Sequence, residues 1–265
     1  MEALLIEGLN AYIRYNDLPG DEPALVFIHG LGSASSSWFP RILRHSLLAT
    51  RRAVLVDLLG FGFSDHPSKF RYSMEDHADT VASLLDYLDL ERCAVIGHSM
   101  GGSIAIVLAT TRPDLVSNLI VAEGNLDPGP GSVSGPITAQ TEEQFMKNGY
   151  AAFLRGVISE GWADYAGTVQ ASDPRAMHRS AVSLIAERHP TFREQLLALS
   201  IPRTFIFGEA SLGEASLGKK NIAHPDVQRL SNDRIRVEIV ENAGHDMMSD
   251  NPDGFAQAIA KSLLL

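Results

Sequence analysis

Cysteine, positive charge and long apolar runs are all scarce in this sequence, and each shortage excludes a class of protein. Cys93 is the single cysteine among 265 residues, so no disulfide can form within the chain. It opens the apolar run 93–96, where we expect a buried packing thiol. No apolar run reaches the length of a membrane-spanning helix, and residues 1–7 lack the charged-then-apolar pattern of a signal peptide. A cytoplasmic protein is therefore expected.

The shortage of lysine and arginine excludes further partners. The 22 basic residues are outnumbered by 32 acidic ones, for a formal net charge of −10. Such a surface repels phosphate backbones and anionic lipid, so we expect no nucleic-acid or membrane partner. Neither C-x-x-C nor H-E-x-x-H spacing occurs, and we predict no metal and no cofactor. The oligomeric state stays open.

What is present is the composition and pattern of an α/β protein. Apolar residues make up 45% of the chain, enough for one sizeable core with an inserted subdomain. Short runs that are mostly or wholly apolar suit strands that are covered on both faces of a parallel sheet, and they alternate with helical patterns. This rhythm predicts a mostly parallel central sheet with helices on both faces. The expected strands include 24–28, 53–56, 94–96, 119–122, 204–207 and 237–240.

The strand rhythm stops after Ala122. A loop rich in proline and glycine covers 127–132, and helix starts follow at Thr141 and Asp173, with no convincing strand before residue 200. We predict an α/β core of residues 1–124 and 200–265, with a helical cap subdomain at 125–199.

A short repeat follows one of the expected strands. The five residues EASLG at 209–213 recur at once as 214–218. Surface loops tolerate such lengthening at little cost, so the repeat predicts an extended surface loop.

The pentapeptide GHSMG at 97–101 predicts a nucleophile. It matches G-x-S-x-G and stands between an expected strand and an expected helix, the context in which that motif presents a reactive serine. Ser99 would occupy a sharp, strained turn, and the glycines around it remove side chains that would clash there. A glycine-serine turn without chemistry is the alternative that the pattern alone leaves open.

A second glycine-rich turn, HGLG at 29–32, follows an expected strand. An acyl-transfer site needs two backbone N–H groups aimed at the developing oxyanion. The amide of Met100, directly after the nucleophile, is one candidate, and the amide of Leu31 is the other. His29 is expected to hold structure through hydrogen bonds.

A serine hydroxyl needs a base, and His245 is the predicted one among nine histidines. It follows the last expected strand and precedes the last helix, where the chain order nucleophile, acid, histidine puts the base. His98 is the variable residue of the pentapeptide. Others lie in polar segments or in the predicted cap: His66, His77, His178, His189 and His224.

The carboxylate that would orient His245 has two possible origins. Glu123 stands directly after the strand 119–122, one strand over from Ser99. Glu209 and Glu214 follow the strand 204–207, and no aspartate occurs there before Asp226. Position favours Glu123, with Glu209 and Glu214 as the alternatives.

Together these motifs resemble the α/β-hydrolase superfamily over essentially the whole chain. The matching pieces are HGLG at 29–32, DLLGFGFSD at 57–65, GHSMGG at 97–102 and GH at 244–245. In most relatives the acid is an aspartate after the strand corresponding to 204–207, and this sequence departs from that pattern. Some haloalkane dehalogenases and a zearalenone-cleaving lactonase carry the acid one strand earlier, which by resemblance assigns it to Glu123. Asp57 and Asp65 match a motif that is usually structural or lines the pocket.

The same resemblance implies an enzyme that cleaves an ester-like acyl bond of a small molecule, either a carboxylic ester or a lactone, through a Ser-His-Glu triad. Hydrolysis of C–C bonds next to a carbonyl and cofactor-free haloperoxidase or perhydrolase activity share this triad and stay as alternatives. So does a non-catalytic protein that binds or senses a small ligand. Aromatic residues that could line the pocket, or pack the core of the cap instead, are Trp38, Phe145, Phe153 and Trp162.

Overall fold

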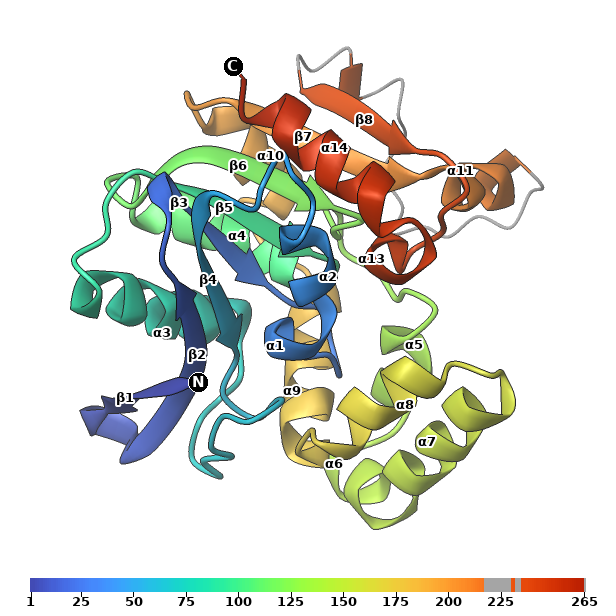
Figure 1. Cartoon of the computed structure of the whole chain (residues 1–265). Coiled ribbons are helices and arrows are strands. Elements are labelled where there is room, and N and C mark those ends of the chain that lie inside the picture. The colour runs from blue at the N-terminus through green and yellow to red at the C-terminus, as the bar shows by residue number, and fades with distance from the viewer. Residues whose placement is uncertain (217–229, 232–234, 265) are drawn as a thin grey trace.

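The computed structural model describes residues 1–216, 230–231 and 235–264, and its strands form one sheet (Figure 1). The strand order is β1-β2-β4-β3-β5-β6-β7-β8. The strands are β1 Glu2–Ile6, β2 Ala11–Leu18, β3 Asp21–Ile28, β4 Arg51–Asp57, β5 Cys93–His98, β6 Val116–Ala122, β7 Arg203–Gly208 and β8 Arg236–Val240.

The sheet is mostly parallel, as the sequence predicts. Among the described strands, only the pairs β1–β2 and β2–β4 are antiparallel, and β4, β3, β5, β6, β7 and β8 run parallel to one another. All six apolar runs named above fall inside strands, and β5 is buried throughout. Because parallel strands end at one edge, the turns after β3, β5, β6 and β8 can share a single site.

Helices cover the sheet and connect its strands. The C-terminal helix α14 packs against α2, β7 and β8, whereas α3 packs against α4. Ser73 caps α3 in a capping box with Asp76, and Asn251 caps α14 with proline at the first position. The helices of this part of the chain are η1 Glu7–Leu9, α1 Ser35–Trp38, α2 Pro40–Leu43, α3 Met74–Tyr87, α4 Met100–Thr111, α11 Glu209–Ser216, α13 Met247–Asp250 and α14 Pro252–Ser262.

The segment 125–199, between β6 and β7, contains helices and no strand; we call it the helical insert. Thr141 caps α6 and Asp173 caps α9, at the two starts expected from the sequence. The buried face of α9 includes Met177 and Ala181. The elements of the insert are α5 Ser134–Thr138, α6 Glu142–Gln144, the π-helical turn η2 Phe145–Gly149, α7 Tyr150–Ser159, α8 Ala163–Gln170, α9 Pro174–Ile185 and α10 Phe192–Ala198.

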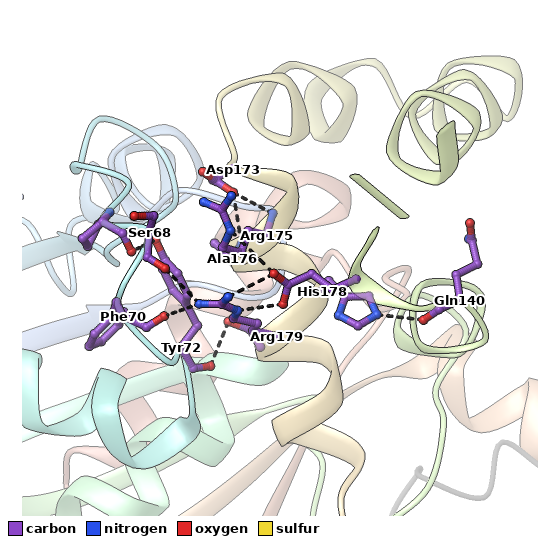
Figure 2. Close-up of polar contacts among 12 residues, drawn as sticks. Ser68, Phe70, Tyr72, Gln140, Asp173, Arg175, Ala176, His178 and Arg179 are labelled. Atoms are coloured by element: carbon purple, nitrogen blue, oxygen red, sulfur yellow. Dashed lines mark hydrogen bonds and ion pairs between the residues drawn. The ribbon is translucent and has the colours of Figure 1, made fainter. Parts of the chain in front are cut away.

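One arginine ties the helical insert to the core. Figure 2 shows Arg179 on α9 donating hydrogen bonds to the carbonyls of Ser68 and Phe70, at 3.1 and 2.8 Å. The same guanidinium pairs with Glu142 at 2.7 Å. Next to it, the hydroxyl of Ser180 donates to the carbonyl of Tyr72 at 3.2 Å. Two charge-assisted bonds from Arg179 and one neutral bond from Ser180 thus attach α9, and with it the insert, to the segment 68–72 of the core.

Two expectations need correction. The repeat at 209–218 is no extended loop, because its first eight residues form α11; Leu217 and Gly218 lie outside the described residues, as does His224. His77 does not lie on the surface: it is fully buried beside Phe61, Phe70 and Tyr72, and α3 presents its ring to the core. The polarity of the repeat suits a loop and a helix alike, whereas the polar residues around His77 do not reveal that its ring lies on the buried face of α3.

The single cysteine, Cys93, is fully buried as expected. Among the described residues, no helix combines the length and the apolar character that crossing a membrane requires.

Candidate active site

Ser99 occupies a strained turn between β5 and α4. Its backbone angles are φ 53° and ψ −121°, a region that residues with a side chain rarely adopt. Glycines make the turn possible by close packing. A Cβ on Gly97 would lie 2.2 Å from the carbonyl oxygen of Gly101, and one on Gly101 would lie 2.2 Å from that of Ile28. The geometry is that of a serine held clear of the sheet edge, as the motif predicts.

His245 and Glu123 meet at the same edge of the sheet. Glu123 directly follows β6, and His245 lies in the turn between β8 and α13. Glu123 Oε2 lies 3.7 Å from His245 Nδ1. The other carboxylate oxygen, Oε1, accepts a hydrogen bond from the backbone N–H of Gly208 at 2.7 Å. The carboxylate side chain has no exposed surface, whereas the imidazole is 47% exposed.

The groups around His245 change the pKa of its imidazole. Loss of water around the ring lowers the pKa of His245, but the adjacent Glu123 carboxylate, aided by Asp246, raises it by more. The net pKa lies above the ordinary value of 6.5. A carboxylate next to Nδ1 favours the tautomer that has its proton on Nδ1, which leaves Nε2 free to accept a proton.

The rival carboxylates do not share this arrangement. Glu209 is exposed, and its Oε2 accepts a hydrogen bond from the backbone N–H of Asn242 at 3.0 Å. The side chain of Glu214 lies outside the described residues. Of the described glutamates considered as the acid, Glu123 is therefore the one in contact with the His245 ring.

His98 holds the turn that carries His245. Its Nε2–H donates to the carbonyl of His245 at 2.9 Å, and the two rings lie 4.8 Å apart. Burial and the neighbouring His245 lower the pKa of His98 to about 3, so the ring stays neutral near pH 7. This contact could not be predicted from the sequence, because it joins residues 147 positions apart.

The turn at 29–32 has the peptide group between Gly30 and Leu31 held by hydrogen bonds. The N–H of Leu58 donates to His29 Nε2 at 3.0 Å, so His29 must carry its proton on Nδ1. That Nδ1–H donates to the carbonyl of Gly30 at 2.7 Å, and the N–H of Ser33 donates to it as well, at 3.2 Å. Since N–H and C=O of a trans peptide point oppositely, the amide of Leu31 is turned away from these partners.

The second predicted donor, the amide of Met100, opens α4. The first amides of a helix have no partner within the helix and carry its positive end. Met100 is fully buried directly after Ser99.

The three residues line one cavity. Ser99, Glu123, His245 and Leu31 share the wall of a small cavity of about 60 Å³, which Leu184 and residues 131–134 of the helical insert also line. A larger cavity of about 310 Å³ opens beside it, lined by Ser99, His245 and Leu31 from the core and by Trp162 and Tyr165 from the insert. The insert thus forms part of the wall around Ser99.

The predicted aromatic lining separates into different places. Trp162, 48% exposed, lines the cavity at Ser99. Trp38 lines a third cavity of about 430 Å³, together with Phe63 and residues of α8. Phe145 is fully buried against Tyr150 and His178 inside the insert. The prediction that Phe145 lines the pocket is therefore wrong, because a side chain without exposed surface cannot contact a substrate. Phe153 packs on Tyr165.

One group of possible metal ligands overlaps this site. His98, His245 and Asp246 bring ligand atoms within 4.8 Å of one another. The Nε2 of His98 is already committed to the carbonyl of His245, so this ring would have to break that bond to coordinate an ion through Nε2.

Comparison with known proteins places this arrangement in a family. Residues 25–258 match the model of the Alpha/beta hydrolase family. A mouse protein named sn-1-specific diacylglycerol lipase ABHD11 is 29% identical over 95% of this chain and 85% of its own. A 2-hydroxymuconate semialdehyde hydrolase of Pseudomonas is 35% identical over 51% of this chain and 46% of its own. An uncharacterised Mycobacterium tuberculosis protein is 40% identical over 44% of this chain and 34% of its own length, so the match spans about a third of that relative.

Solved structures at about 20% identity share the fold. A thermophilic esterase from Thermogutta terrifontis matches with a TM-score of 0.80, over 100% of this chain and 98% of its own. The enol-lactonase from Burkholderia xenovorans LB400 matches with a TM-score of 0.78 over 100% of both chains.

Proposed function

Because the chain belongs to the alpha/beta hydrolase family, we propose that it hydrolyses carboxylic esters or lactones with Ser99 as the nucleophile. One observation carries the proposal: Ser99, on its strained turn, lines the same cavity as His245, whose Nδ1 lies 3.7 Å from the buried Glu123 carboxylate. Esterases, a lactonase and a lipase among the similar proteins support the same bond type.

The proposed reaction has two steps. Ser99 Oγ attacks the acyl carbonyl while His245 Nε2 takes the hydroxyl proton, and the C–O bond then breaks as that proton passes to the leaving alkoxide. The alcohol departs, or stays attached to the acyl chain where the substrate is a lactone. Water then attacks the acyl-enzyme, His245 takes and returns its proton in the same way, and a carboxylic acid leaves Ser99 free.

The amides of Leu31 and Met100 are proposed to bind the oxyanion of both tetrahedral intermediates. Removing one such donor typically lowers kcat about 10²- to 10³-fold. In this reaction the helical insert acts as a cap, since its residues Trp162, Ser132 and Val133 line the cavity beside Ser99.

Two measurements test the proposal. The first is hydrolysis of p-nitrophenyl acetate, butyrate and octanoate and of a series of acyl homoserine lactones by the purified chain and by Ser99→Ala. We expect turnover by the chain and a fall in kcat of about 10⁵-fold or more in the variant. The second is labelling by a fluorophosphonate, with the modified peptide identified by mass spectrometry; the label should sit on Ser99.

The outcomes are distinct. Turnover that survives in Ser99→Ala contradicts the nucleophile. Labelled Ser99 without turnover of any ester or lactone contradicts the bond type and favours a C–C hydrolase or a ligand-binding role. Absence of both labelling and turnover contradicts the proposal as a whole.

A further inference from the structure

We propose that Tyr165, on α8 of the helical insert, is a positioning residue that holds the oxyanion turn 29–32 in its working shape from the side opposite the core. The inference rests on the proposed function, because it assigns Tyr165 a part in the same site. It makes formation of the oxyanion hole depend on the insert.

The contact is a single hydrogen bond between the insert and the turn. The Tyr165 hydroxyl donates to the carbonyl of Leu31 at 2.9 Å, across 134 positions of sequence. The side chain is buried between Trp38 and Phe153, whose rings meet it edge-on. Burial, and to a lesser degree Asp246, raises the pKa of this hydroxyl, so it keeps its proton and acts as a donor.

The turn and the insert are packed together at this point. Gly32 adopts φ +71°, and a Cβ placed there would lie 2.8 Å from Tyr165 Oη. The same Cβ would lie 3.1 Å from Val169 Cγ2 and 3.2 Å from Met177 Cε, on α8 and α9. At Gly32 the turn is therefore in direct contact with α8 and α9, and the position of these helices limits the conformations that the turn can adopt there.

The bonds on the two sides of the turn fix successive peptide groups. Within the turn region, His29 and Ser33 bind the carbonyl of Gly30, and Leu58 of the core holds the His29 ring. On the insert side, Tyr165 binds the carbonyl of Leu31, which belongs to the next peptide. The amide of Leu31 is part of the first peptide, and its direction depends on both, because rotation of the second peptide strains the short turn that joins them. Without the Tyr165 hydroxyl, the carbonyl of Leu31 loses the hydrogen bond that holds the second peptide.

Attachment of the insert does not depend on this bond. The N–H of Asp173 donates to the carbonyl of Gly60 at 2.9 Å, and Arg179 and Ser180 bind the 68–72 segment. Because these bonds attach the insert to the core without the Tyr165 hydroxyl, loss of that hydroxyl should change the turn 29–32 and leave the insert in place.

The test compares Tyr165→Phe with Tyr150→Phe. Tyr150 is a matched control, because its partly buried hydroxyl donates to the carbonyl of Val169 at 2.7 Å within the same insert and does not touch the turn. For Tyr165→Phe we expect kcat for p-nitrophenyl butyrate to fall about tenfold with KM unchanged, as for loss of an interaction made in the transition state. A trifluoromethyl ketone forms a serine adduct that carries an oxyanion, and its inhibition constant should rise by the same factor. Tyr150→Phe should match the unmodified chain in both.

Amide hydrogen exchange of peptides that cover 29–33 supplies a measurement independent of turnover. Faster exchange in Tyr165→Phe, but not in Tyr150→Phe, supports the proposal.

An unchanged kcat and ketone affinity in Tyr165→Phe, while the unmodified chain hydrolyses the ester, overturns the proposal for Tyr165 and leaves the proposed function standing. If the unmodified chain hydrolyses nothing, the proposed function fails, and the exchange experiment alone decides whether Tyr165 holds the turn. Equal losses of kcat and melting temperature in both variants also overturn it, since they indicate a general effect on the insert.

Discussion

Glu123 Oε2 lies 3.7 Å from His245 Nδ1 while Glu123 Oε1 accepts the N–H of Gly208 at 2.7 Å. The carboxylate therefore bridges the end of β7 and the turn after β8 from its own position at the end of β6. Because Gly208 fixes one oxygen, the other is directed to the imidazole without needing a side chain from β7.

This relationship predicts the effect of Glu123→Gln. The amide can still accept from Gly208, but its NH₂ group facing Nδ1 favours the wrong imidazole tautomer, and kcat for p-nitrophenyl butyrate should fall about 10³- to 10⁴-fold. Glu209→Gln, at an exposed carboxylate that binds Asn242, is the control and should retain kcat. A larger loss in Glu209→Gln than in Glu123→Gln would move the acid to the segment after β7.

The raised pKa of His245 sets the pH dependence. As the proposed base, His245 works as neutral imidazole, so kcat/KM should rise with pH through a midpoint above the ordinary 6.5. Glu123→Gln removes the carboxylate that raises the pKa of His245, whereas the loss of water around the ring still lowers it. The midpoint of the residual activity should therefore move to lower pH. Initial rates of ester hydrolysis from pH 5 to 9 measure both midpoints, and an upward shift in the variant would contradict the assignment.

Removal of the His98 ring should weaken catalysis through the turn that carries the base. His98→Ala loses the bond to the His245 carbonyl, worth about 1 kcal/mol, and we expect kcat to fall about fivefold to tenfold. His178→Ala is the matched control, since His178 Nε2 is 2.8 Å from the carbonyl of Gln140 inside the insert (Figure 2). It should lower the melting temperature without lowering kcat. Equal kcat in both variants would show that the His98 ring does not contribute to catalysis.

The glycines of the serine turn can be tested by stability. Gly101→Ala places a Cβ 2.2 Å from the carbonyl oxygen of Ile28, and we expect a loss of about 1–3 kcal/mol in the free energy of unfolding. Gly156→Ala, on α7, meets nothing within 4 Å and should be stabilising by about 0.5–1 kcal/mol. Urea unfolding followed by circular dichroism measures both. A stable Gly101→Ala variant would show that the turn can move away from β3.

The cavity lining predicts substrate-dependent effects. Trp162 lines the insert wall of the cavity at Ser99, and we expect an octanoyl chain but not an acetyl group to extend to it. Trp162→Ala should therefore raise KM for p-nitrophenyl octanoate severalfold and leave KM for the acetate nearly unchanged. Ile158→Ala, a similarly exposed apolar position on α7, serves as the control. Equal KM changes for both esters would place the acyl chain elsewhere.

The sequence predicted those parts of the fold that depend on local pattern. Apolar runs identify the strands, and caps such as Thr141 and Asp173 identify helix starts, because each signal lies within a few residues. The serine turn is predictable for the same reason: its glycines and its strand-helix context are contiguous. Its relation to Glu123 could be anticipated from strand adjacency in a parallel sheet.

Contacts between distant segments could not be predicted in this way. The bonds of His98 to His245 and of Tyr165 to Leu31 join residues far apart in sequence, and nothing at either end differs from an ordinary buried polar residue. Phe145 and Trp162 are both aromatic residues of the insert, and only the packing of α8 and η2 decides that one is enclosed and the other faces the cavity. The duplicated EASLG segment was misread because its polarity is compatible with a loop and with the exposed face of a helix.

With Glu123 at the end of β6, no reacting group of the proposed triad comes from the connection after β7. That connection can then change length in evolution without altering the chemistry, and the tandem EASLG at 209–218 is such a change already present in the sequence. For protein engineering, the second copy offers an insertion point for a tag or a binding peptide, because the proposed reacting residues follow β5, β6 and β8.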